Sequence, residues 1–405
     1  MNNTQGITQT LQGHYKVGVV NAATEEIHWT HEGHNLVLNA GMDNLYNMSV
    51  ADQLLYGICG MGTRPNNQFS GLSQISQSGN TVLLCNTSGN ITNFSASFDV
   101  YPTLVQVGDM ISCSLGQQLT VTSVNSNGVN LTVTPSYTFS SQSFAVYKTT
   151  QTGLQLEISR SNTYQPGLGS CGTTFTGSTA VHRRSYNFPV LVTNQSYNEV
   201  GVGWESSGPG NTFSRILLNT PLIVNAGFYL RLIYDLSATY ASASTSGSIS
   251  IGGWSNTNAT QSVQTFLGSY VDVDGDSQNA LAVLDPYFLT AGDGLYAGIF
   301  VSSNSSSLAP FGSAVDRSAV SGLGPQMSKA TYTNGTYYCD RTGNTISGSS
   351  LLVNSFGFGV SGNLGYSAAN TLGQAYCVVL NNSQSLLNTQ TITLTFRTSW
   401  NRILG

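Results

Sequence analysis

The chain has 405 residues with 13 Lys and Arg against 18 Asp and Glu, so charged side chains make up 8% of it. A typical soluble domain carries roughly a quarter charged residues, and a net charge of −5 supplies none of the basic surface that duplex nucleic acid requires. Hydrophobic residues reach 40%, which excludes intrinsic disorder, because disorder combines low hydrophobicity with high net charge. The length predicts two or three domains.

The sequence contains no signal for membrane insertion. No stretch of about 18 or more apolar residues appears, and the first residues, MNNTQGITQT, lack the basic start and apolar run of a secretory signal. We therefore expect a soluble protein that is made in the cytoplasm, unless a secretory signal was removed ahead of Met1.

Residues 1–80 predict a hairpin followed by a short helix and the first strands of a sandwich. Apolar and polar residues alternate over Tyr15–Val20 and over Glu26–Glu32, with turn residues at Asn21–Thr24 between them. Asn39 is predicted to cap a helix over Ala40–Met48. The apolar stretch LLYGICG follows.

Residues 81–148 predict a small β-barrel inserted into the parent fold. Short alternating runs surround the pair Asn127-Gly128, which is the strongest short hairpin signal. Five or so short strands over such a length are typical of a small barrel.

Residues 149–245 predict longer alternating strands, such as Phe228–Leu236, that continue the sandwich of the first segment. Residues 246–405 predict a C-terminal β-rich domain. In it, Ser277 is expected to cap a short helix over 277–285 that ends before Pro286, and Ile392–Trp400 alternates as a closing strand. The predicted fold class is mainly β: antiparallel β-sandwich domains with a small inserted β-barrel and few short helices.

The cysteines indicate structure rather than chemistry. None forms a C-x-x-C pair, and their spacings are long and irregular. Since a free buried cysteine behaves as a small hydrophobic residue, we interpret them as structural thiols in place of disulfides or metal ligands. The six are Cys59, Cys85, Cys113, Cys171, Cys339 and Cys377.

Three histidines, in EEIHWTHEGH, lie close enough in sequence to suggest a metal site. A strand over Glu26–Glu32 would place Trp29 and His31 on one face and His28 and Glu32 on the other, so His28 and His31 would point apart. We therefore expect hydrogen-bonded strand and turn histidines at 28, 31 and 34, with a site on a symmetry axis left open.

The metal site that the sequence predicts is an acidic loop, VDVDGDS. Asp272, Asp274 and Asp276 place three carboxylates two residues apart, which suits Ca²⁺, the one cofactor considered. The loop is not an EF-hand, because Gly275 is misplaced and Val283 stands where the bidentate Glu belongs. The alternative is a solvated turn ahead of a helix N-terminus, where Asp is favoured anyway.

Other motifs carry no catalytic prediction. Gly357, Gly359 and Gly362 match G-x-G-x-x-G, but neither a helix nor an acidic residue follows, so we discard a dinucleotide site. His182 stands beside the basic pair Arg183-Arg184, which could contact a phosphate or a sugar acid; we favour a solvated or subunit-facing pair. Since no nucleophile motif appears, we predict no catalytic residues and no enzymatic activity.

Five stretches resemble tailed-bacteriophage virion proteins, especially those of tails, baseplates and fibres. They are HNLVLNAGMDNLY, GMGT, SYNEVGVGWESSGPGNTFSRILL, PLIVNAGFYLRLIYDLS and TLTFRTSWNRIL. The order of elements is similar too: an N-terminal hairpin, an NLV-x-N-x-G helix, and later E-x-G-x-G and R-x-L strands. The similarity covers about half the chain, and the segment 81–148 is an insertion relative to it.

The resemblance implies a structural component of a phage particle, in the tail or baseplate, that assembles as a homo-oligomer with other virion proteins. The low charge fits a subunit surrounded by copies of itself, and only Lys16, Lys148 and Lys329 are available as lysines to guard strand edges. The alternatives are a module that binds a host surface glycan, a tail-associated polysaccharide depolymerase using the acidic loop, and a non-viral bacterial adhesin.

Overall fold

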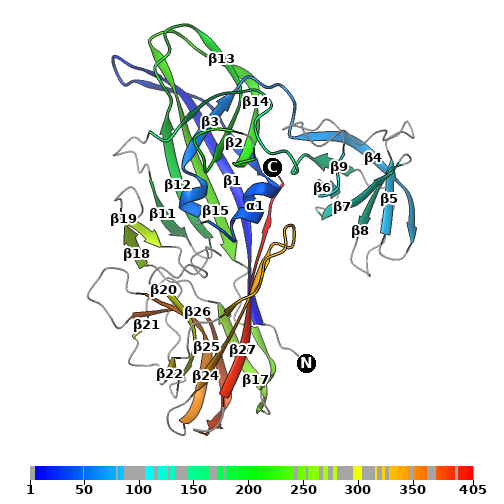
Figure 1. Ribbon diagram of the computed structural model, residues 1–405, viewed down its shortest axis with the longest axis vertical. Coiled ribbons are helices and arrows are strands. Elements are labelled where there is room, and N and C mark those ends of the chain that lie inside the picture. The colour runs from blue at the N-terminus through cyan, green and yellow to red at the C-terminus, as the bar shows by residue number, and fades with distance from the viewer. Residues whose placement is uncertain are drawn as a thin grey trace.

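The computed structural model confirms the predicted fold class (Figure 1). The chain is mainly β, with antiparallel sheets, a small closed barrel and, in the part that the structure describes, two short helices, α1 (Asn39–Asn44) and α2 (Val50–Gln53). No helix among these residues is long and apolar enough to cross a membrane. The described residues are 5–48, 50–78, 81–85, 105–113, 117–125, 128–132, 144–163, 171–176, 179–208, 210–240, 245–251, 254–263, 268–271, 277–280, 295–302, 315–316, 322–323, 328–346, 351–362, 371–387 and 391–404.

A curled sheet of 12 strands forms the main body. Nine of its strands follow one another in the order β10-β3-β13-β14-β2-β1-β15-β12-β11, and β27, β24 and β23 join beside β1. Their bounds are β1 Gln5–Asn21, β2 Ile27–Val37, β3 Tyr56–Gly60, β10 Glu157–Ser161, β11 Cys171–Thr176, β12 Thr179–Asn187, β13 Gln195–Gly203, β14 Thr212–Val224, β15 Phe228–Tyr240, β23 Ser328–Lys329, β24 Tyr338–Ile346 and β27 Thr391–Arg402.

The predicted N-terminal hairpin is confirmed and is longer than expected. β1 and β2 pair in antiparallel fashion from Gly13 opposite Asn35 to Val20 opposite Ile27. On β1 and β15, alternate residues are buried, as the period of two predicts. These residues form the core between the two halves of the curled sheet.

The sheet curls until β12 packs against β3. Tyr186 of β12 is fully buried, and its hydroxyl donates a hydrogen bond to the carbonyl of Leu54. Gly57 of β3 lies against the Tyr186 ring, and a Cβ there would come within 2.6 Å of the ring. The close packing of the two strands therefore requires glycine at 57.

A separate closed barrel stands beside the curled sheet (Figure 1). Its strands follow the order β4-β5-β8-β7-β6-β9. The barrel starts at Asn67, earlier than the boundary at 81 drawn from the sequence. Strands β7 and β8 form the expected hairpin and pair from Val121 opposite Leu131 to Asn125 opposite Gly128. The bounds are β4 Asn67–Ser78, β5 Thr81–Cys85, β6 Met110–Cys113, β7 Gln118–Asn125, β8 Gly128–Thr132 and β9 Phe144–Tyr147.

A second sheet, of seven strands, is built from the C-terminal part of the chain, and β18 and β19 form a separate pair. The helix predicted to begin at Ser277 is wrong at its first residues, because Ser277–Ala280 is strand β19 and pairs with β18. The bounds are β16 Thr245–Ile251, β17 Trp254–Val263, β18 Gly268–Val271, β19 Ser277–Ala280, β20 Leu295–Ser302, β21 Val315–Asp316, β22 Gly322–Leu323, β25 Leu351–Gly362 and β26 Thr371–Leu386.

The first and last strands of the chain join each other. Gln5–Leu11 of β1 pairs in parallel with Phe396–Arg402 of β27, and the same edge of β1 continues with β2 from Gly13. Figure 1 shows that these two long strands of the curled sheet extend toward the seven-stranded sheet. The C-terminal segment therefore completes the sheet that the N-terminal segment begins.

Helix α1 differs from its predicted cap. Leu38 occupies the N-cap position without a side-chain hydrogen bond, and Asn39 is the first helical residue. The Asn39 side chain instead donates to the carbonyl of Gly108, at 2.9 Å, and accepts from Arg402. A tertiary contact thus takes the amide that local capping would have used.

Candidate functional site

The predicted calcium site cannot be placed, because Asp272, Asp274 and Asp276 lie outside the described residues. Among the residues that are described, no group of three or more His, Cys, Asp or Glu side chains is arranged to bind a metal ion.

The histidine-rich strand β2 is more irregular than its sequence predicted. A β-bulge at Thr30 leaves Glu32 opposite Lys16 and Trp29 opposite Gly18. The Lys16 ammonium lies 3.4 Å from the Glu32 carboxylate and 5.0 Å from the Trp29 ring centre, so both side chains share its face. The prediction that Trp29 and Glu32 lie on opposite faces is therefore wrong.

Because of the same bulge, the prediction that His28 and His31 point apart is also wrong. His28 lies opposite Val19 and His31 opposite Val17, two residues apart on β1 and therefore on one face. The prediction of hydrogen-bonded histidines is confirmed for His31, whose ring nitrogens lie 2.9 Å from the hydroxyls of Thr30 and Thr220. His34 packs edge-on against His14, with ring centres 5.5 Å apart.

The basic pair on β12 is split between two faces of the sheet. Arg183 is exposed and pairs with Asp235, with an Nη2–Oδ2 distance of 2.6 Å. Arg184 and His182 are buried, so the prediction of a solvated pair is wrong for Arg184. Burial, followed by the Arg184 charge, lowers the pKa of His182 to about 3.

The cysteine prediction is confirmed where side chains are described. Cys59, Cys113 and Cys339 are free and buried, and burial raises the pKa of the Cys59 thiol. Gly357, Gly359 and Gly362 all lie inside strand β25, which does not provide the phosphate-binding turn of a dinucleotide site.

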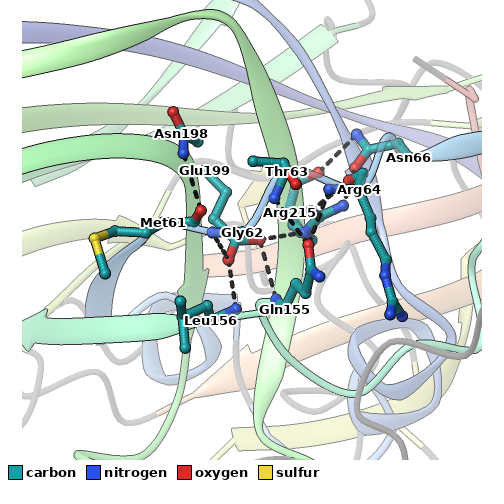
Figure 2. A network of polar contacts seen from close by, with 10 residues as sticks. All are labelled: Met61, Gly62, Thr63, Arg64, Asn66, Gln155, Leu156, Asn198, Glu199 and Arg215. Carbon is teal, nitrogen blue, oxygen red and sulfur yellow. Dashed lines mark hydrogen bonds and ion pairs between the residues drawn. The ribbon is translucent and has the colours of Figure 1, made fainter.

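The most elaborate polar cluster that the structure describes surrounds a buried ion pair, Glu199 of β13 and Arg215 of β14 (Figure 2). Arg215 Nε donates to Glu199 Oε2 at 2.8 Å, and neither side chain is exposed. Glu199 also accepts backbone hydrogen bonds from Gly62, Gln155 and Leu156, at distances of 2.8–3.0 Å. Charge and hydrogen-bonding capacity are thus both satisfied, as a buried pair requires.

Arg215 and Gln155 hold the segment that leads into the barrel. Arg215 donates to the Asn66 side chain at 2.8 Å and to the Arg64 carbonyl at 2.7 Å. The Gln155 side chain accepts from the backbone amides of Thr63 and Arg64, at 2.8 and 2.9 Å. The chain therefore enters β4 from a segment, 62–66, whose backbone at 62–64 is hydrogen-bonded to the side chains of Glu199, Gln155 and Arg215 (Figure 2).

A second buried pair lies where the chain leaves the barrel. Lys148 Nζ donates to Asp109 Oδ2 at 2.5 Å, and both side chains are fully buried. Burial lowers the pKa of Lys148, while the Asp109 charge opposes that shift. Asp109 also accepts from the Gln106 amide, at 2.9 Å, and from the Thr150 hydroxyl, at 2.6 Å.

The second pair is tied to the end of the chain through α1. Asn39 Nδ2 donates to the Gly108 carbonyl at 2.9 Å, and Arg402 donates to the Val37 carbonyl at 2.7 Å and to the Asn39 side chain. We call the two ion pairs and these partners the barrel anchors. Their hydrogen bonds and ion pairs involve both segments that connect the barrel to the curled sheet.

The anchors were not predicted from the sequence, although part of the signal was present. Glu199 and Arg215 belong to the E-x-G-x-G and R-x-L patterns quoted for the phage resemblance. Gly201, in the same pattern, lies against β14, where a Cβ would come within 2.4 Å of the Ser214 carbonyl oxygen. Strand alternation alone does not tell which isolated acidic and basic residues meet in a core.

Comparison with protein-family models finds no match, and comparisons with curated proteins and with solved structures find no significant match.

Proposed function

We propose that this chain is a non-enzymatic structural component of a tailed-phage particle, in the tail or baseplate, that assembles with copies of itself and with other virion proteins. The observation that carries the proposal is the composition of one sheet edge. Strand β11, CGTTFT, ends the path of the curled sheet and pairs with β12 alone among the described strands, while β19 lies close to it without pairing. It contains no charged residue and no proline.

Such an edge favours pairing with another chain. Natural edge strands are commonly protected by lysine, proline or a bulge, and β11 runs in regular register without any of them. Of the three lysines, Lys148 is fully buried in an anchor. A subunit whose edges are covered by its neighbours has no need of such protection.

Exposed apolar side chains at one end of the curled sheet support the same proposal. Val192 is 91% exposed and Ile223 is 64% exposed, and they lie on the β12–β13 connection and on β14. Contact surfaces are richer in apolar groups at their centre than a solvated surface. The barrel, whose connecting segments are held by the barrel anchors, adds a second surface for contacts with other proteins.

The purified chain should therefore form a defined homo-oligomer in native mass spectrometry and in negative-stain micrographs. Thr174→Lys places a charge at an exposed position of β11 and should shift the chain to smaller species. Asn219→Lys, the matched control, adds the same charge at an exposed position of the inner strand β14 and should leave the oligomer unchanged. A wild-type chain that stays monomeric at all concentrations would contradict the proposal.

A second candidate function is binding of a host surface glycan. The observation that favours it is an open pocket at the rim of the curled sheet, lined by Glu25, Asn162 and Asn187 together with apolar side chains. Carboxylate and amide groups beside apolar surface are the chemistry that saccharides require. Binding of the purified chain to a glycan array tests this candidate independently of its oligomeric state.

A further inference from the structure

The pocket at the rim of the curled sheet has a volume of about 450 Å³. That volume falls within the range of small-molecule sites, roughly 300–1,000 Å³. Its lining comes from four segments: the β1–β2 turn, the end of β10, the β12–β13 connection and the start of β15. The barrel anchors lie elsewhere, so the pocket is a separate feature of the fold.

Glu25 reaches the pocket from a backbone conformation that side chains rarely adopt. Its φ is 57°, in the left-handed region, and its backbone amide donates to the Asn21 carbonyl at 2.8 Å. Left-handed conformations of residues other than glycine cluster at ligand-binding sites, where the surrounding structure holds them. Here the turn presents a carboxylate at the pocket.

The Glu25 carboxylate is also held by a hydrogen bond from Tyr229 of β15. The Tyr229 hydroxyl donates to Glu25 Oε2 at 2.7 Å, and Arg231 donates to that hydroxyl at 2.8 Å and to Asn187 Oδ1 at 2.7 Å. The Glu25 side chain is 59% exposed, whereas that of Arg231 is 4% exposed and lies 3.7 Å away. A ligand therefore meets an oriented acceptor whose charge is balanced from within the protein.

The remaining groups make a simple ion a poor occupant. Arg160 lines the pocket, but its guanidinium donates to the Glu157 carboxylate and to the carbonyls of Glu205 and Gly208. It is thus already engaged and is not offered to an anion. A cation bound by Glu25 would also lie close to the positive charge of Arg231, which would repel it. A neutral ligand with several hydroxyl groups needs no free guanidinium and is not repelled by Arg231.

The exposed part of the lining matches such a ligand. Asn162 and Thr163 offer an amide and a hydroxyl, and Pro189 and Val190 offer apolar surface. A sugar ring carries hydroxyl groups at its edge and C–H groups on its faces. We propose that this pocket binds a neutral saccharide, with Glu25 accepting hydrogen bonds from adjacent hydroxyls and Val190 packing against the ring. This inference rests on the glycan-binding candidate and gives it a site.

The test uses an array of neutral oligosaccharides, followed by titration of the full chain with the methyl glycosides of glucose, galactose, mannose and N-acetylglucosamine. Wild type should bind at least one of these probes. Glu25→Gln removes the charge at nearly constant shape and should weaken that binding about tenfold or more. Glu26→Gln, at an exposed position of the same turn outside the pocket, is the matched control and should bind as wild type does.

The possible outcomes separate the site from the function. If saccharides bind and Glu25→Gln weakens binding while Glu26→Gln does not, the site is supported. If saccharides bind and both variants bind as wild type does, the chain is a glycan-binding protein but this pocket is not its site. If no probe binds, the site and the glycan-binding candidate both fail. Thermal unfolding of each variant shows whether the fold is intact, as expected for a carboxylate that is more than half exposed.

Discussion

Glu199 and Arg215, 16 residues apart in the sequence, meet as a fully buried ion pair with a Nε–Oε2 distance of 2.8 Å. Removing one partner leaves a buried charge without its counter-ion, which costs about 3–5 kcal/mol. Glu199→Gln should therefore lower the free energy of unfolding by about that amount, measured by urea denaturation. The double variant Glu199→Gln with Arg215→Met should lose less stability than the sum of the losses of the two single variants, because no unpaired charge remains.

Removing one contact of the barrel anchors should expose the backbone of the segment that leads into the barrel. Arg64 lies in the segment that leads into the barrel, and its backbone is hydrogen-bonded to Gln155 and Arg215. Gln155→Ala removes the acceptor of the Thr63 and Arg64 backbone amides and should accelerate hydrogen–deuterium exchange of these two amides under native conditions. Exchange at an unchanged rate would show that the segment is held by other contacts.

At the exit from the barrel, Lys148→Met should destabilise the chain by about 3–5 kcal/mol, because Asp109 then keeps a buried charge without its ammonium partner. Asp109→Asn in the Lys148→Met background should restore part of the loss, because it removes the remaining charge. Chemical denaturation of the two variants checks this order. Equal stability of the two variants would contradict it.

Stability should fall in acid because of His182. Its pKa of about 3 in the folded chain lies below the ordinary value of 6.5, so the unfolded state binds a proton first as the pH drops. The contribution of neutral His182 to the free energy of unfolding is fully present above pH 6.5. It declines by about 1.4 kcal/mol per pH unit below that value, down to about pH 3. Between pH 6.5 and 5 the loss should reach about 2 kcal/mol. In His182→Gln this part of the pH dependence should disappear.

An aromatic stack fastens the C-terminal part of the chain to α1. The Tyr46 and Tyr332 rings lie 4.8 Å apart, Tyr332 and Trp400 lie 5.9 Å apart, and the Tyr332 hydroxyl donates to Asp43 Oδ1 at 2.6 Å. Tyr332→Phe should cost about 1.5–3 kcal/mol for the hydrogen bond to a charged group. Tyr332→Ala should cost more, since both stacking contacts are lost too.

The neighbouring variant Asn334→Ala, at an exposed position of the same loop, serves as the control for this stack. Thermal unfolding should rank it close to wild type, above Tyr332→Phe, with Tyr332→Ala lowest. If Asn334→Ala is as unstable as Tyr332→Ala, the loop itself and not the stack determines the loss.

The positions of strands were predictable where alternation was strong. The β1–β2 hairpin and strands β15 and β27 form where the period of two predicted them. The same period could have placed Arg184 inside, because it is two residues from Tyr186 on β12 and therefore shares its face. The charge of Arg184 favoured an exposed position, but the alternation of faces along the strand places its side chain inside.

Failures of the sequence prediction have local physical reasons. The bulge at Thr30 changes the faces of Trp29 and the histidines, and no residue type announces a bulge of this kind. Asn39 has the side chain of a cap, but Gly108 and Arg402 compete for its amide. Each of these depends on groups that are far away in the chain.

By itself, then, the sequence determined the class of the fold, because hydrophobic periodicity is a local property that each strand carries in its own residues. It also determined the low content of charged residues, 8% of the chain. Only the tertiary structure decided that β1 pairs with β27, that Glu199 meets Arg215 and Asp109 meets Lys148, and that Glu25 stands above Tyr229. Those pairings join residues between 16 and several hundred positions apart, and their energy arises from burial and geometry that no short stretch of chain contains.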